Sequence, residues 1–133
     1  MLGFGARYTK TVQQLESVAR RDPQAVPPEL TEQLAWAYVQ AEMLRLHVCR
    51  RLSERADGIE LGARGSIDKL LMTWVEQSVG HAALSAGASS ALAGADDALL
   101  DTYLYSRAQS VMGGTSQIQK NIIATRVLGL PVR

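Results

Sequence analysis

The part of the sequence with the clearest chemical potential begins at a glycine pair. Gly113 and Gly114 precede Thr115, Gln117 and Gln119, and an apolar run follows. The first N–H groups of a helix have no partner within the helix, and glycine lets a ligand approach the backbone, so such a helix start can bind an anion. A threonine hydroxyl can cap the helix or donate to a ligand, and glutamine amides offer both donors and acceptors. The residues alone therefore predict either a polar ligand site or an ordinary capped surface helix.

Residues that could bind a metal or act as a nucleophile are scattered along the sequence. His47 and Cys49 are two positions apart on a predicted helix, so their side chains point in different directions. His81 stands alone, and an isolated histidine is more often packed or solvated than bound to a metal. The HExxH, CxxC and GxSxG patterns are absent. We therefore predict no metal site and no nucleophilic centre of these kinds.

A group of arginines lies in one predicted helix with carboxylates close by. A solvated face of ion pairs is the usual explanation for such a group, and a ligand role is the lesser alternative. The arginines are Arg45, Arg50, Arg51 and Arg55, and the nearby carboxylates are Glu42 and Glu54.

Apolar residues recur at helical spacing over most of the chain, so the sequence predicts an all-α fold, an antiparallel four-helix bundle. Prolines and glycines separate the helices, because proline lacks a backbone donor and glycine favours a helix stop. The predicted helices cover residues 7–20, 28–57, a third segment capped by Ser66, 96–112 and 115–128. Residues 62–66 are predicted to form a loop. Residues 81–95 have such small side chains that they could pack closely against a neighbour or fray into a loop.

The helix predicted over residues 28–57 carries two apolar stripes. The first consists of Leu30, Leu34, Ala37, Ala41, Leu44, Val48 and Leu52. The second consists of Trp36, Val39, Met43 and Leu46. A helix that is apolar on two sides lies between neighbours in a bundle or at a subunit interface, so we predict self-association and a central position for this helix. In the last predicted helix, the core face is expected from Ile118, Ile122, Ile123 and Val127.

Composition limits the possible functions. The 133 residues suit one domain, and 14 basic against 13 acidic residues give a formal net charge of +1. This balance argues against nucleic acid or an anionic membrane surface as a partner. A single cysteine, Cys49, permits no internal disulfide and fits a reducing compartment. No apolar run is long enough for a membrane span and the first residues do not resemble a signal peptide, so a cytoplasmic location is expected.

The closing segment resembles the C-terminal signature of acyl-CoA dehydrogenases. GGTSQIQKNIIATRVLGLP, residues 113–131, is similar to the family pattern E-G-T-S-E/Q-I-Q-R-N-I-I-A-x-R-x-L-G, with conservative departures at Gln117 and Lys120. YSRAQSVMGGT is similar to the family segment that leads into this signature, with Arg107 at its second arginine. SIDKLL is similar to a segment that carries a family lysine, here Lys69, and DPQAVPPELTEQLAWAYVQAEMLR resembles the long bundle helix of actinobacterial-type members. The resemblance covers residues 1–133 as one C-terminal domain.

The resemblance implies a helical bundle that joins subunits and completes an FAD site. In family members this domain builds a tetramer and reaches the flavin of a neighbouring subunit, which implies a homo-oligomer or a partner dehydrogenase chain. By the same likeness Thr115 and Gln117 touch FAD, with the amides of Gly113 and Gly114 beside them. The likeness also implies an adenosine-diphosphate contact near residues 85–87. Acyl-CoA would bind only together with the other domains of the family.

Gly113 occupies the position at which most family members carry the catalytic glutamate. The family's reaction removes the α proton of an acyl thioester with a carboxylate while hydride passes from the β carbon to the flavin. Glycine cannot accept a proton, and residues 1–12, the counterpart of an alternative glutamate position, contain no carboxylate. We therefore assign no catalytic residue and expect no dehydrogenation by the purified chain alone.

Two functions remain open at this stage. The chain is either the C-terminal part of a flavin-dependent acyl-CoA dehydrogenase or a bundle that kept the assembly surface of that family and lost catalysis. An upstream coding frame that encodes the family's middle domain would favour the first. A true start codon without a neighbouring partner gene would favour the second.

Overall fold

The computed structural model describes residues 13, 20, 28–92 and 97–131, and all regular structure within them is helical. The predicted helix over residues 7–20 therefore lies almost wholly outside the described residues. The described elements are α2 (Pro28–Ala56), a 3-10 turn η1 (Gly62–Arg64), α3 (Gly65–Leu92), α4 (Asp97–Ala108), α5 (Ser116–Ile122) and a π-helical turn η2 (Ile123–Val127). The prediction of an all-helical fold is confirmed. None of the described helices is long and apolar enough to cross a membrane.

The long helix α2 has the ends that its sequence predicts. Pro28 stands at its start, where a missing N–H has no cost, and Glu29 lies at the positive end of the helix dipole. At the other end, Gly58 takes a φ of +77°, and its N–H donates to the carbonyl of Arg55. The next amide, that of Ile59, donates to the carbonyl of Glu54. Glycine thus ends α2 by turning the chain in the left-handed region, which other residues rarely adopt.

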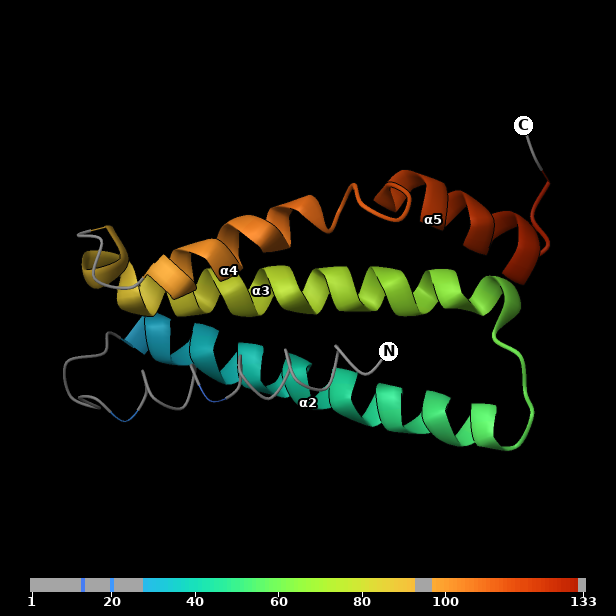
Figure 1. Ribbon diagram of the computed structural model, residues 1–133, viewed down its shortest axis with the longest axis horizontal. Coiled ribbons are helices and arrows are strands. Elements are labelled where there is room, and N and C mark those ends of the chain that lie inside the picture. The colour runs from blue at the N-terminus through green and yellow to red at the C-terminus, as the bar shows by residue number, and fades with distance from the viewer. Residues whose placement is uncertain (1–12, 14–19, 21–27, 93–96, 132–133) are drawn as a thin grey trace.

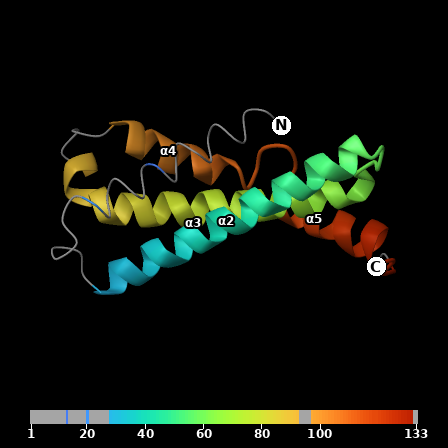
Figure 2. The same ribbon diagram turned by 90° about the horizontal axis from the view of Figure 1, so that it is seen from below.

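Helix α3 forms the middle layer of the described structure. It runs antiparallel to α2 on one side, while α4 and α5 follow each other along its other side (Figure 1). The view turned by 90° shows α2 crossing α3 obliquely (Figure 2). The prediction that residues 28–57 form the central helix is thus wrong for the described residues, because α3 and not α2 contacts both neighbouring layers.

The core between α2 and α3 is built from the first predicted stripe and small side chains of α3. Its buried members are Leu34, Ala37, Ala41, Leu44, Val75, Val79, Ala82 and Ala83. The small side chains of the alanines let the two backbones approach closely in this layer. Leu52, predicted as the last member of the stripe, is 49% exposed. Arg51 is buried in its place, because its partners lie on α2 and on α3.

Three predicted boundaries differ from the structure. Residues 62–66 are not a loop, since Gly62–Arg64 form a 3-10 turn that leads directly into α3 at Gly65. Ser66 is therefore buried inside the first turn of α3 and is not its N-cap. The helix predicted over residues 96–112 ends at Ala108, because the carbonyl of Ala108 accepts from the amides of both Val111 and Met112 and closes a turn there.

The small-residue segment over 81–95 is helical as far as Leu92, so the alternative of a frayed loop is wrong up to that residue. The small side chains at Ala82 and Ala83 belong to the core. Gly80 lies against α4, where an added Cβ would be 3.5 Å from the hydroxyl of Ser106. Gly80, Ala82 and Ala83 thus allow close packing on both sides of α3.

Candidate functional site

The glycine pair forms a sharp turn between α4 and α5. Gly113 and Gly114 have φ values of +66° and +96°, in the region that favours glycine. The side-chain amide of Gln119 folds back into this turn, and its Nε2 donates to the carbonyl of Gly113 at 2.8 Å. A Cβ on Gly114 would lie only 2.7 Å from that nitrogen, whereas a Cβ on Gly113 would meet nothing within 4 Å. Gly114 is thus needed for close packing, while Gly113 faces open space.

Thr115 caps α5, as one of the two predicted alternatives requires. Its φ and ψ are −60° and 157°, and its Oγ1 accepts a hydrogen bond from the amide of Ile118 at 3.2 Å. The amide of Ser116 donates to the carbonyl of Ser110 at 3.0 Å. These bonds occupy N–H groups that the sequence offered to an anion. The hydroxyl proton of Thr115 stays available to a ligand, because the hydroxyl only accepts in its cap.

The structure separates the two glutamines of this segment. Gln117 is exposed, so its amide can donate to and accept from a molecule outside the chain. Gln119 is buried and holds the turn, although the sequence offered it equally as a ligand group. Ile118, predicted to face the core, is exposed, since the face of α5 that turns inward carries Gln119. The donor set left at the surface fits one side of a polar cofactor: the exposed Gln117, the hydroxyl of Thr115 and open backbone at Gly113.

Helix α3 holds the glycine turn in place through the end of α4. The ammonium of Lys69 donates to the carbonyl of Gln109 at 2.8 Å, and the hydroxyl of Thr73 donates to the carbonyl of Lys69. One turn further along α3, the amide of Gln77 donates to the carbonyl of Ser106 at 3.1 Å. Lys69, which resembles the family lysine, therefore fixes the end of α4 that leads into the glycine turn.

Arg107 ties the same two helices in the opposite direction. Its guanidinium donates to the carbonyl of Gln77 at 3.0 Å and lies 4.7 Å from the ring centroid of Tyr103. Gln77 and Thr73 had no motif to mark them, and only their packing against α4 gives them this role. The predicted contact near residues 85–87 falls partly outside the described side chains, and Ser85 is exposed.

Of the arginine group on α2, Arg45, Arg50 and Arg51 form ion pairs, as the usual explanation of such a group predicts. The exposed Arg45 pairs with the half-buried Glu42, and the exposed Arg50 pairs with the half-buried Glu54. Arg51 is different, because it is buried and donates to Glu54 and, at 3.0 Å, to Asp68 of α3. The hydrogen bond to Glu54 is the main cause that raises the pKa of Arg51, and the same bond lowers the pKa of Glu54.

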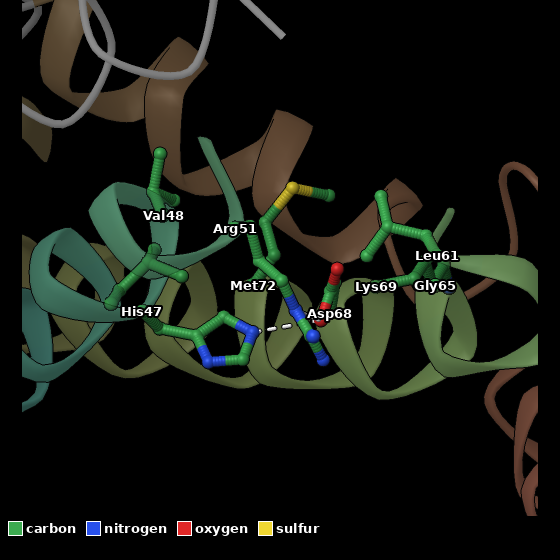
Figure 3. Close-up of a pocket in the computed structure, with 9 residues that line it drawn as sticks. His47, Val48, Arg51, Leu61, Gly65, Asp68, Lys69 and Met72 are labelled. Carbon is green, nitrogen blue, oxygen red and sulfur yellow. Dashed lines mark hydrogen bonds and ion pairs between the residues drawn. The ribbon is translucent and has the colours of Figure 1, made fainter. Parts of the chain in front are cut away.

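Arg51 also borders a mainly apolar groove of about 280 Å³ between the end of α2 and the start of α3 (Figure 3). In Figure 3, His47 and Arg51 both point toward Asp68, and Nε2 of His47 lies 2.7 Å from Oδ1 of Asp68. Nε2 of His47 donates to this carboxylate when it carries a proton. The polar groups at this groove bond to one another, so we interpret them as a structural tie between α2 and α3.

No group of three or more His, Cys, Asp or Glu side chains in the described part of the chain is arranged to hold a metal ion. Cys49 is exposed on α2.

Comparison with known proteins identifies the family. Residues 5–128 match the family model described as "Acyl-CoA dehydrogenase, C-terminal domain". The chain is 30% identical to "Acyl-CoA dehydrogenase IpdE1" of Mycolicibacterium smegmatis over 133 aligned positions, covering 98% of this chain and 33% of that protein. It is also 30% identical to "Acyl-CoA dehydrogenase IpdE1" of Mycobacterium tuberculosis, covering 98% of this chain and 34% of that protein. No solved structure matches the chain significantly.

The chain belongs to the acyl-CoA dehydrogenase family, and it corresponds to the C-terminal domain of that family. It spans about a third of the length of the curated relatives that it matches.

Proposed function

We propose that the chain is the helical-bundle part of a flavin-dependent acyl-CoA dehydrogenase, where it supplies part of the FAD site and an oligomer interface. The observation that supports this most directly is the polar turn at residues 113–117, which is exposed at Gly113 and Gln117. This turn lies inside the segment that matches the family model, and its surface groups fit a polar cofactor.

The residues proposed to hold the cofactor are those that the turn leaves at the surface. Gln117 offers an exposed amide, and Thr115 offers a hydroxyl proton while its oxygen caps α5. Gly113 leaves room beside the backbone, because nothing lies within 4 Å of where its Cβ would stand. Gly114 is proposed to contact the cofactor through its backbone amide, because the side chain of Gln119 already occupies the space next to its Cα. These groups line one side of a ligand only, so a second protein surface must complete the site.

Bound FAD would accept the hydride that leaves the β carbon of an acyl-CoA thioester. The turn itself has no proton acceptor at Gly113, where family resemblance predicts a carboxylate. We therefore propose that the catalytic base lies outside this turn, on a part of the assembly that brings a carboxylate to the acyl α carbon. In this proposal the chain positions the cofactor and does not transfer the proton.

A second candidate function is a non-catalytic assembly module derived from the same family. Two observations favour it: the glycine at position 113, and the exposed apolar stripe of Trp36, Val39, Met43 and Leu46 on α2. Both functions share the assembly surface, and they differ in whether a complex that contains this chain binds flavin.

Flavin binding by a reconstituted complex separates the two candidates. The chain would be co-expressed with any acyl-CoA dehydrogenase chain that is encoded next to it, and the absorbance of the purified complex would be scanned for flavin. A flavin-bearing complex that keeps this chain stoichiometrically supports the first function. A stable complex without flavin, which FAD added in excess does not load, supports the assembly module.

The role of Gln117 gives a residue-level test of the same proposal. Gln117→Ala removes an exposed amide without touching the turn, so the FAD affinity of the complex should fall by about 5- to 10-fold, as expected for the loss of one or two hydrogen bonds. The matched control is Asn121→Ala, which removes an exposed amide one turn further along α5. Equal FAD affinity in the two variants and the unchanged chain would show that Gln117 does not contact the cofactor.

A further inference from the structure

A second groove opens between the N-terminal half of α2 and the middle of α3. It measures about 580 Å³, which is within the usual range for ligand sites. Its lining includes Glu29, Glu32, Trp36 and Gln40 of α2, and Trp74, Ser78 and His81 of α3. The α2 residues follow a helical spacing that gathers them on one face. Since α2 and the α4–α5 layer lie on opposite sides of α3, this groove is separate from the glycine turn (Figure 1).

The inner end of the groove holds a polar group that lacks a partner. Gln40 is only 8% exposed, and its side-chain oxygen Oε1 is buried without a hydrogen bond among the described residues. A buried acceptor that forms no bond is costly, so native structures rarely keep one unless something else supplies the donor. Gln40 is part of the groove lining, and the terminal torsion of glutamine is broad, so its amide can reorient when a ligand binds. None of the described residues supplies this donor, so an N–H or O–H group of a molecule in the groove would complete the bonding of Gln40.

The rim of the groove has the features that attract a planar cation. Glu29 and Glu32 are exposed carboxylates on the first turns of α2. Trp36 and Trp74 stand at the two sides with 58% and 53% of their surface exposed, which is unusual for such large apolar rings. Aromatic faces attract cations, and carboxylates accept hydrogen bonds from them.

We propose that this groove binds a guanidinium group. A guanidinium is a flat cation with five N–H donors, so one group can stack on a tryptophan, pair with a carboxylate and donate to Gln40. An ammonium ion carries the same charge but neither stacks nor reaches several acceptors in one plane. The groove is larger than a guanidinium alone, so its remaining space receives the rest of the molecule that carries the group. This molecule is either a free guanidine compound or an arginine side chain on a partner protein.

Tryptophan fluorescence reports on this groove, because Trp36 and Trp74 are the two tryptophans of the sequence. Trp36 also belongs to the second apolar stripe of α2, so the concentration of the chain is kept constant during the titration. The full chain would be titrated with N-acetyl-arginine amide and, in parallel, with N-acetyl-citrulline amide, which has the same shape without the charge. The arginine compound should give a saturable change in emission at about 10-fold lower concentration than the citrulline compound. No saturation, or equal response to both compounds, would overturn the proposal.

Two further titrations identify where the guanidinium comes from. Methylguanidine represents the free head group, and the blocked tripeptide Gly-Arg-Gly represents an arginine on a protein chain. Tripeptide affinity about 10-fold above that of methylguanidine supports a partner protein, and equal affinity supports a free guanidine compound. Failure of both compounds to bind overturns the proposal.

Variants connect the binding to the residues of the groove. Gln40→Leu should weaken arginine-amide binding by about 10-fold and raise the urea midpoint of unfolding, because it removes the unbonded buried oxygen. Glu32→Gln should weaken binding without a change in that midpoint, whereas Glu60→Gln, which removes an exposed carboxylate between α2 and η1, should change neither. If Gln40→Leu and Glu32→Gln both bind the arginine compound as well as the unchanged chain, the compound binds outside the groove and the proposal fails. None of these outcomes depends on flavin binding, so the result stands apart from that of the proposed function.

Discussion

At the scale of single residues, the glycine turn assigns different roles to two neighbours of the same type. Both Gly113 and Gly114 adopt positive φ, but only at Gly114 does the space for a Cβ already contain another group. Gly113 therefore leaves room for a ligand and Gly114 leaves room for Gln119. The hydrogen bond from Gln119 to the carbonyl of Gly113 then fixes the direction in which α5 leaves the turn.

This difference predicts unequal losses of stability. Gly113→Ala should lower the free energy of unfolding by about 1 kcal/mol, since it adds only the strain of a left-handed backbone. Gly114→Ala should cost about 2 kcal/mol or more, because the new methyl group also displaces the amide of Gln119. Urea denaturation followed by circular dichroism measures both.

The matched control is Gly65→Ala. Gly65 has a helical φ of −58° and nothing within 4 Å of its missing Cβ, so alanine there should stabilise the chain by about 0.5 kcal/mol. If Gly113→Ala proved as damaging as Gly114→Ala, the contact between Gln119 and the turn would not be what distinguishes the two positions.

At the scale of helices, α2 and α3 are joined by an apolar layer and, near their connection, by an ionic tie. Arg51 reaches Asp68 across the helix pair while it also bonds Glu54 on its own helix. The bond from Arg51 keeps the pKa of Glu54 below its ordinary value of 4.5. Protonation of Glu54 therefore weakens the group that holds Arg51 in position.

The lowered pKa of Glu54 predicts a particular dependence of stability on pH. A carboxylate whose pKa is lowered on folding stabilises the folded state above its unfolded pKa, and this contribution is lost as the pH falls through the folded pKa. The unchanged chain should therefore be more stable than Glu54→Gln at pH 7, and the difference should shrink from about pH 5 downward. Thermal unfolding of both chains between pH 7 and pH 3 measures this.

The partner that causes the shift can be checked in the same experiment. When Arg51→Met is added to both the unchanged chain and the Glu54→Gln chain, the pH-dependent difference in stability between the two should become much smaller. A difference that keeps its size without Arg51 would mean that another group lowers the pKa of Glu54.

The sequence predicted those features of the helices that depend on neighbours along the chain. The start of α2 at Pro28, its stop at Gly58 and the cap at Thr115 follow from local backbone chemistry, and the structure has all three. The burial of Arg51 could not be predicted in this way, because Asp68 lies 17 positions further along the chain. Nor could the burial of Gln119, which depends on the path of the turn. Both were predicted from their polarity to face solvent or ligand.

The position of α2 in the bundle also could not be predicted from neighbours along the chain. The doubled apolar stripe of α2 was interpreted as contact with neighbours on both sides, either within a bundle or at a subunit interface. In the described structure the second stripe is exposed, and α3, whose small residues were interpreted as either packing or fraying, is the helix between two layers. Periodicity identifies which residues avoid water, but not whether they meet their own chain or another one.

At the scale of the whole molecule, the second stripe forms an exposed apolar row on α2. Trp36, Val39, Met43 and Leu46 lie along the outside of α2 and are each between 45% and 58% exposed. A continuous apolar row of this kind is typical of a surface that binds another protein. We also propose, from the family to which the chain belongs, that this C-terminal domain supplies an oligomer interface. We therefore expect the chain to self-associate at micromolar concentration through α2.

Charge on the stripe should abolish this association without unfolding the chain. In Leu46→Glu a carboxylate replaces an exposed leucine, so the helical circular dichroism should stay the same while the molar mass from light scattering falls to that of the monomer. Leu52→Glu is the control, because Leu52 is similarly exposed on the same helix but lies about half a turn of the helix surface away from the stripe. If Leu46→Glu and Leu52→Glu have the same molar mass as the unchanged chain, the stripe is not the interface. If the unchanged chain is itself a monomer at micromolar concentration, the stripe does not serve self-association, and a partner dehydrogenase chain becomes the candidate that covers it.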